Sequence, residues 1–410
     1  MSNMKKSEEI KVSTDKAHIE ELLTRSVDTI YPTREALEKV LLSGKRIRLY
    51  LGIDPTSPHL HVGHAENILL LRRFQDLGHE VILLMGDFTG RIGDPTDKTA
   101  TRTQLTEAQV NENLKTFKAQ ASKVLRFTGP NAAQIKFNSD WHSKLTFEDV
   151  VRLAAHFTLQ QMVERSMFQE RIKAGKPIGL HEFFYPLMQG YDSVAMDVDL
   201  EVGGTDQIFN MLAGRTLMRA MHNKEKFVIA NRLIEDPITG KKMSKTEGSL
   251  VNLDDAPNDM FGRMMALPDE LAFIVAELAT MMPLEEIKKL RAQVNAGGNP
   301  RDAKLIISET TVALYHSEKE AKEAREEWVR IFSNKERPED APKLTLTSHT
   351  LTLLELLMHA GVESKSEARR LIEQNAVKIN DEVHTDGTKS MMLKSGDIVR
   401  IGKHRFFEIA

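Results

Sequence analysis

The stretch between residues 46 and 88 constrains the fold more than any other part of the chain. An apolar run, Arg46–Ile53, precedes a loop with two prolines, an amphipathic segment that ends at Gly78, and a second apolar run, Glu80–Phe88. Runs of these lengths in this order predict a strand, a loop, a helix and a second strand. Such a βαβ unit forms a parallel sheet, because the crossover returns the chain in the same direction.

The hydrophobic pattern predicts several further elements. A length of 410 residues exceeds one ordinary core and indicates two or three domains. Helical periodicity runs from His18 to about Ile30, and it dominates again after Leu253 as far as Ser333. The other expected elements are helices at Thr33–Leu42, Leu353–Ala360 and Lys365–Asn375, and strands at Gln134–Asn138, Val228–Ala230, Val377–Ile379, Ile398–Ile401 and Phe406–Ile409.

A charged, proline-bearing stretch, NKERPEDAPKLTLTSHT, separates the last two groups of elements and is typical of a linker. The expected fold class is α/β. We expect a Rossmann-like parallel-sheet domain over residues 1–253, an α-helical domain over 254–335, the linker over 336–350, and a small α/β module over 351–410.

Composition excludes several classes of protein. The chain has no cysteine, which excludes disulfides and zinc sites built on thiolates. The net charge is −3, so any contact with RNA depends on a local basic face. The first sixteen residues lack the apolar stretch of a signal peptide, and no run approaches the ~20 apolar residues of a membrane span. We therefore expect a cytoplasmic protein with no membrane partner.

A histidine motif, His61-Val-Gly-His64, lies between the first predicted strand and its crossover helix. The start of a helix after a strand attracts anions, because unpaired N–H groups and the helix dipole face the ligand. Gly63 would let a flat ring approach the backbone. Two other interpretations stay open for these residues alone: an ordinary turn with solvated histidines, and a metal site that includes His59.

A lysine loop, Lys242-Met-Ser-Lys245-Thr246, lies between Gly240 and Gly248. Mobile ammonium groups suit a triphosphate whose leaving group gains negative charge during the reaction. The loop alone is also compatible with a solvated basic turn.

A polar stripe on an otherwise apolar segment forms the third signal. Tyr185, Gln189 and Asp192 have spacings of four and three, which place them on one face of a helix. Such a stripe faces a polar ligand, or else the three side chains satisfy one another.

The histidine and lysine motifs, separated by about 180 residues, resemble the signature pair of class I aminoacyl-tRNA synthetases. With the polar stripe and Gly203-Gly-Thr-Asp-Gln207, the chain resembles bacterial tyrosyl-tRNA synthetases from Tyr50 to its C-terminal module. The resemblance implies activation of L-tyrosine by ATP with Mg²⁺, transfer to tRNA(Tyr), and a homodimer. It implies no metal held by the protein. The apolar first crossover and the helix after Asp149 are candidates for the dimer interface.

The resemblance also assigns roles to individual residues. The positions that match the tyrosine site are Tyr50 and Asp192 for the phenol, Asp94, Tyr185 and Gln189 for the ammonium group, and Gln207 in the same pocket. Those that match the ATP site are Gly52, Asp54, Gly63, Gly204, Asp206 and Lys245. Those that match the catalytic groups are His61, His64, Lys98, Arg102, Lys242, Lys245 and Thr246.

The C-terminal segment SKSEARRLIEQNAVKINDE resembles a small RNA-binding module first recognised in a ribosomal small-subunit protein. The resemblance implies tRNA contact through Lys365, Arg369 and Arg370. A solvated amphipathic helix is the alternative.

Three other functions fit the sequence less well. A tryptophanyl enzyme shares the fold but does not need two groups on a phenol, so Tyr50 with Asp192 favours tyrosine. A non-catalytic RNA-binding paralogue would not need every motif intact. A nucleotidyltransferase would not need the lysine loop or the RNA module.

Overall fold

The computed structural model describes residues 10–96, 104–237, 240, 250–333, 342–346, 350–362, 364–380, 382–402 and 405–410. The chain forms two compact units, Met1–Lys322 and Glu323–Ala410, and each is considered by itself. Among the described residues no helix has the length and apolarity to cross a membrane.

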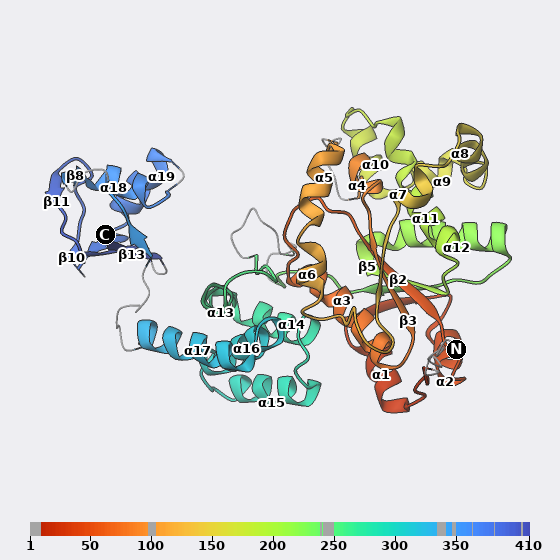
Figure 1. The fold of residues 1–410 in the computed structure, drawn as a ribbon, viewed down its shortest axis with the longest axis horizontal. Helices are drawn as coiled ribbons and strands as arrows, with labels where there is room; N and C mark the ends of the chain where they lie inside the picture. Colours follow the sequence, from red (N-terminus) through yellow and green to blue (C-terminus); the bar gives the residue numbers. More distant parts are fainter. Residues whose placement is uncertain are drawn as a thin grey trace, which may run out of the picture. The chain divides into compact units, whose positions relative to one another are not determined.

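A six-stranded sheet forms the centre of the first unit (Figure 1). The strand order is β1-β6-β5-β2-β3-β4, and all neighbours are parallel except β1 and β6. The bounds are β1 Val27–Tyr31, β2 Arg48–Ile53, β3 Glu80–Met85, β4 Gln134–Phe137, β5 Leu200–Gly204 and β6 Phe227–Asn231.

The central strands are buried on both faces, as parallel strands covered by helices must be. Val81 to Met85 of β3 are all buried, and so are all five residues of β5. Such strands show continuous apolar runs rather than alternation, which explains why β2 and β3 were predictable from the sequence.

The direction of strand order changes between β2 and β5. The chain leaves β2 through α3 (Val62–Asp76) toward β3, and it leaves β5 through α12 (Ile208–His222) toward β6 on the other side. Right-handed crossovers in opposite directions place the two helices on opposite faces of the sheet. Between the carboxyl ends of β2 and β5 this leaves the crevice in which α/β proteins bind ligands.

Other helices surround the sheet, and α11 packs closely on α12 (Figure 1). Their bounds are α1 Lys16–Thr24, α2 Arg34–Leu42, α4 Thr89–Ile92, α5 Glu107–Leu114, α6 Phe117–Ala121, α7 Ser139–His142, α8 Phe147–Ala154, α9 Leu159–Val163, α10 Ser166–Lys173 and α11 Tyr185–Met196, with short 3₁₀ turns η1 Leu180–Phe183 and η2 Thr205–Gln207.

Two strands of the sheet differ from the prediction. The helix expected as far as Ile30 ends at Thr24, because Ser26 takes a left-handed φ of 66° and the β-branched residues after it form β1. β5 was not predicted, since its pattern is short and ends in two glycines.

After Leu253 the chain is helical, as predicted. The helices are α13 Pro257–Ala266, α14 Asp269–Leu278, α15 Leu284–Asn295, α16 Pro300–Tyr315 and α17 Glu318–Ser333. The side chain of Arg25 donates to the backbone carbonyls of Glu277 (2.9 Å) and Thr280 (2.9 Å), which joins this helical part to the sheet.

The second unit is a small α/β module with its own core, which includes Leu356, Ile372 and Val399. Its bounds are β7 Lys343–Leu344, β8 Thr350–Thr352, α18 Leu353–His359, α19 Lys365–Glu373, β9 Val377–Ile379, β10 Glu382–Val383, β11 Ser390–Met392, β12 Ile398–Ile401 and β13 Arg405–Ile409. The predicted fold class, a parallel-sheet α/β domain with helical content and a small module, is confirmed.

Candidate active site

A cavity of about 380 Å³ opens at the crevice between β2 and β5. Its walls come from the carboxyl ends of these strands, the start of α3 and the first half of α11. The predicted site residues that line it are Tyr50, Gly52, Asp54, His61, Gly63, His64, Asp94, Tyr185, Gln189, Asp192, Gly204, Asp206 and Gln207. Residues far apart in the sequence thus meet at the position that the topology favours.

The remaining predicted residues fall into two groups. Lys98, Arg102, Lys242, Lys245 and Thr246 lie outside the described residues. The three predicted RNA-binding residues are exposed on α19 in the second unit: Lys365, Arg369 and Arg370.

The two histidines of the first motif stack at the start of α3. Their ring centroids are 3.8 Å apart, and the backbone N–H of His61 donates to His64 Nδ1 at 3.2 Å. Because Nδ1 accepts this bond, a neutral His64 carries its proton on Nε2. A Cβ at residue 63 would come within 3.0 Å of the His61 ring, so the close stacking depends on glycine.

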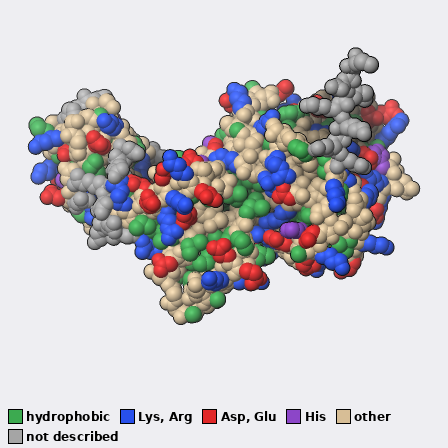
Figure 2. All heavy atoms as spheres, turned by 60° about the horizontal axis from the view of Figure 1, so that its bottom comes forward, with side chains coloured by type: hydrophobic (Ala, Val, Ile, Leu, Met, Phe, Trp, Pro, Cys, Tyr) green, Lys and Arg blue, Asp and Glu red, His purple; other side chains and the backbone are tan. Residues whose placement is uncertain are grey.

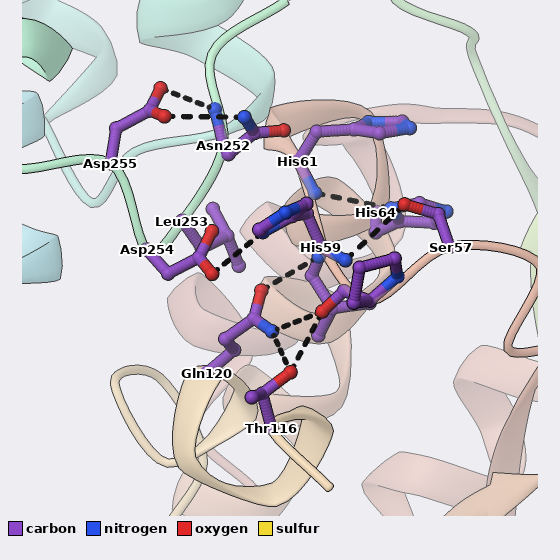
Figure 3. Close-up of polar contacts among 12 residues, drawn as sticks. Ser57, His59, His61, His64, Thr116, Gln120, Asn252, Leu253, Asp254 and Asp255 are labelled. Atoms are coloured by element: carbon purple, nitrogen blue, oxygen red, sulfur yellow. Dashed lines mark hydrogen bonds and ion pairs between the residues drawn. The ribbon is translucent and has the colours of Figure 1, made fainter. Parts of the chain in front are cut away.

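One side of the loop before α3 is held by α6. Gln120, which is buried, accepts a bond from the backbone N–H of Leu60 at 2.7 Å and donates to the carbonyl of Pro58 at 2.8 Å (Figure 3). One side chain therefore satisfies two backbone groups that a loop leaves unpaired.

The other side of the loop is held by the segment that follows the predicted lysine loop. The backbone of Leu60 and Val62 pairs with Leu253 and Val251 at 2.8 and 3.0 Å. His59 Nδ1 lies 2.7 Å from a carboxylate oxygen of Asp254 (Figure 3). The loop before α3 is therefore hydrogen bonded to the segment that follows the lysine motif.

This geometry does not support a metal site built from His59, His61 and His64. The imidazole of His59 is engaged with Asp254, whereas those of His61 and His64 stack on each other. Within the described ranges, no group of three or more His, Asp or Glu side chains is arranged as metal ligands.

Polar residues cluster at one end of the cavity. Tyr185 and Thr89 donate their hydroxyls to Asp54 at 2.9 and 2.7 Å, and Gln207 donates to Asp94 at 2.8 Å. Burial raises the pKa of Asp54 to about 7, although both hydroxyls oppose the shift.

Tyr50 and Asp192 lie at another part of the wall. The Tyr50 hydroxyl is wholly buried and is 3.0 Å from Ser193 Oγ. Asp192 accepts bonds from Trp141 Nε1 at 2.8 Å and pairs with His142 Nε2 at 2.7 Å. Burial raises the pKa of Asp192, while these donors favour its charged form.

The supporting residues of Asp192 were not predicted. Asn138, Trp141 and His142 come directly after β4, and Asn138 also donates to Asp192 at 3.4 Å. Polar residues after the carboxyl end of a parallel strand are the sequence signal that indicates them.

Acidic side chains outnumber basic ones on the described wall of the cavity, although one of them, Glu201, is paired with the buried Lys226. Such a wall favours an ammonium group, because opposite charges attract strongly where water is partly excluded. The carboxylates on it are Asp54, Asp94, Asp192, Glu201 and Asp206.

Comparison with known proteins decides the family. A family model described as tRNA synthetases class I (W and Y) matches residues 42–333. The tyrosine–tRNA ligase of Moorella thermoacetica is 44% identical over 390 residues, which cover 94% of this chain and 94% of that protein. This chain belongs to the tyrosine–tRNA ligases.

Further comparisons support the same family. The tyrosine–tRNA ligase of Haemophilus influenzae is 41% identical over 388 residues, or 94% of this chain and 95% of that protein. A model described as Tyrosine–tRNA ligase SYY-like C-terminal domain matches residues 334–409. The predicted resemblance, and with it the assignment as an aminoacyl-tRNA synthetase, is confirmed.

Solved structures share the fold of a tyrosine–tRNA ligase at lower identity. A C-terminally truncated mitochondrial tyrosyl-tRNA synthetase of Aspergillus nidulans has a TM-score of 0.66 at 23% identity, covering 78% of this chain and 95% of that one. The enzyme of Archaeoglobus fulgidus, solved with L-tyrosine, has a TM-score of 0.58 at 19% identity, covering 76% and 99%.

Proposed function

We propose that this chain activates L-tyrosine with ATP and then transfers tyrosine to the 3′-terminal adenosine of tRNA(Tyr). In the first step a carboxylate oxygen of tyrosine attacks the α-phosphorus, the bond to the β-phosphate breaks, and pyrophosphate leaves. In the second step a ribose hydroxyl attacks the carbonyl carbon of the adenylate and AMP leaves. The observation that carries this proposal is the convergence of thirteen predicted residues on one cavity.

The proposed tyrosine site uses the two polar parts of the wall. Tyr50 donates to the phenolic oxygen, and Asp192 accepts the phenolic proton. Asp94, Tyr185 and Gln189 hold the ammonium group, with Gln207 beside them. The buried position of Tyr50 and Asp192 supports this arrangement, because phenylalanine would leave both groups desolvated and unpaired.

The proposed ATP site lies at the start of α3. His61 and His64 donate to phosphate oxygens, and Asp206 takes a ribose hydroxyl. ATP enters as its magnesium complex, with the ion held by phosphates and water. In this proposal the backbone approaches the adenylate at Gly52, Asp54, Gly63 and Gly204. Outside the described ranges, charge is stabilised by Lys98, Arg102, Lys242 and Lys245, and Thr246 belongs to the same lysine motif.

Rate then comes from positioning and from charge stabilisation, and no side chain acts as a nucleophile. The position of His64 supports this assignment, since the backbone N–H of His61 holds its ring at the start of α3, where anions bind.

We assign tRNA binding in part to α19, where Lys365, Arg369 and Arg370 are exposed while Ala368 and Ile372 pack into the module core. On the face drawn in Figure 2, Lys and Arg side chains are interspersed with Asp and Glu. In this proposal the basic side chains of α19 provide a local electrostatic attraction to RNA, although the net charge of the chain is −3. We keep the domain limits at 1–253, 254–335, 336–350 and 351–410.

We also propose a symmetric homodimer in the cytoplasm. The apolar side chains of the first crossover, such as Ile68 and Leu70, are buried in the core and cannot supply an interface. The other candidate for the dimer interface is the helix after Asp149. Exposed apolar side chains on and near this helix support that choice: Phe147, Val151, Leu159, Ile172 and Leu180. Light scattering that gave the mass of one 46.4 kDa chain, with full activity, would overturn the dimer.

The test of the main proposal is ATP–pyrophosphate exchange with each of the twenty amino acids in turn. We expect exchange with tyrosine and a strong preference over tryptophan and phenylalanine. Exchange that depends on tryptophan, or no exchange with any amino acid, would contradict the proposal.

A further inference from the structure

A buried ion pair lies at the cavity wall, and the function proposed above gives it no role. Tyr50 and Glu201 are direct partners in the register of β2 and β5, so their side chains leave the sheet on the same face. Lys226, just before β6, pairs its ammonium group with the Glu201 carboxylate, and both side chains are buried. Ser193 of α11 completes the group.

The ammonium group of Lys226 has a full set of acceptors. Besides Glu201 it donates to Ser193 Oγ at 2.9 Å and to the carbonyl of Met211 at 3.0 Å, which uses its three protons. A Cβ at Gly214 would come within 2.4 Å of the Lys226 nitrogen, so the room for this cation depends on a glycine.

The Lys226 ammonium group determines the direction of the hydrogen bond between Ser193 and Tyr50. Ser193 Oγ accepts a hydrogen bond from Lys226 and has one hydroxyl proton of its own to donate. The Tyr50 oxygen lies 3.0 Å away, whereas the Glu201 oxygen lies 3.4 Å away and already accepts from Lys226. The shorter bond, which does not compete with the ion pair, is therefore favoured.

Tyr50 consequently accepts from Ser193, and its own proton is free to be donated. The backbone carbonyl of Gln189 lies 3.4 Å away, which is too long for a strong O–H···O bond, and the Glu201 carboxylate, which also acts on this hydroxyl, already accepts from Lys226. A ligand oxygen in the cavity is the better acceptor.

The same pair orients the side chain of Gln189. Its Nε2 donates to the other oxygen of Glu201 at 3.0 Å, so its amide oxygen is turned away from Glu201 and is available as an acceptor. Gln189 lines the cavity, where an ammonium group needs acceptors.

We propose that Lys226, Glu201 and Ser193 are positioning residues for amino-acid specificity. They make Tyr50 a hydrogen-bond donor toward a phenolic oxygen and Gln189 an acceptor toward an ammonium group. The inference rests on the proposed function, since it explains how that site recognises its substrate.

The test is a double-mutant cycle on the ratio of kcat/KM for tyrosine to that for phenylalanine in pyrophosphate exchange. Ser193→Ala and Lys226→Met are each made alone and in combination with Tyr50→Phe. We expect each to lower the ratio about five-fold to ten-fold in the unaltered background, the range for one net hydrogen bond. Neither should change the ratio further once the Tyr50 hydroxyl is absent.

A merely structural role would give a different result. General damage lowers activity toward both amino acids and leaves their ratio unchanged, or lowers it equally in both backgrounds; either outcome overturns the proposal. If Lys226→Met does not fold, Ser193→Ala decides alone, because it keeps the ion pair. The buried pair Arg171–Glu182 is the matched control, and Arg171→Met with Glu182→Gln should leave the ratio unchanged. Absence of tyrosine-dependent exchange in the unaltered chain would refute the proposed function instead.

Discussion

At the scale of single residues, Asp54 shows how the cavity holds a carboxyl group that is easily protonated. It accepts two hydroxyl donors, Thr89 and Tyr185, yet burial raises its pKa to about 7. A Cβ at Gly86 would come within 2.0 Å of its oxygen, so the room for this carboxyl group depends on a glycine after β3.

Asp54→Asn should change how stability depends on pH. The folded-state pKa of about 7 lies above the unfolded value of 3.8, so the folded state binds more protons between these values. Stability of the unaltered chain therefore falls as pH rises from about 4 to about 7, and the asparagine variant lacks this fall. The difference between the two should grow by on the order of 4 kcal/mol across that window. Urea unfolding at several pH values measures it, with the exposed Asp140→Asn as control; a constant difference would contradict the expectation.

The position of a residue on the cavity wall was predictable where a motif carries it, and not where the fold brings partners from elsewhere. Tyr50 and Asp192 were predicted from the family pattern. Trp141 and His142 reach Asp192 only because β4 lies at the edge of the same sheet. No local spacing relates residues fifty positions apart.

At the scale of elements, the loop before α3 is hydrogen bonded on both sides, and the Gln120 side chain alone contacts two of its backbone groups. Gln120→Leu should leave the Leu60 N–H unpaired and remove one of two donors to the Pro58 carbonyl, which also accepts from the Thr116 hydroxyl at 2.8 Å. We expect a loss of about 1–3 kcal/mol in the free energy of unfolding and a raised KM for ATP, with little change in KM for tyrosine. The exposed Gln134→Leu on β4 serves as control. Equal rises in both KM values would argue against a local effect on the start of α3.

Element prediction was reliable for long apolar runs and unreliable for short ones. β2, β3 and α3 are buried and strongly patterned, so their existence followed from periodicity. β1 and β5 were not recognised, since sheet pairing rather than local pattern decides their conformation. The crevice could be placed only once β5 was known to lie beside β2.

At the scale of the whole molecule, we assign activation to the first unit and part of tRNA binding to the second. Replacing Lys365, Arg369 and Arg370 with glutamine should weaken tRNA binding and leave pyrophosphate exchange unchanged. The slope of log Kd against log salt concentration should fall by on the order of 2, because each phosphate that a side chain neutralises adds about 0.7 to it. Filter binding at several salt concentrations measures the slope, and Glu373→Gln on the same helix is the control. An unchanged slope would mean that α19 does not meet the RNA backbone.

The central claim is that the cavity recognises tyrosine by its phenol through Tyr50 and Asp192. The direct measurement is kcat/KM for tyrosine and for phenylalanine in pyrophosphate exchange, with the unaltered chain and with Tyr50→Phe. Removing one hydroxyl leaves no buried charge unpaired, so the tyrosine preference should fall by roughly one to two orders of magnitude, from the ~1–3 kcal/mol of one such partner. An unchanged preference would contradict the claim, because Tyr50 would then not contact the phenol.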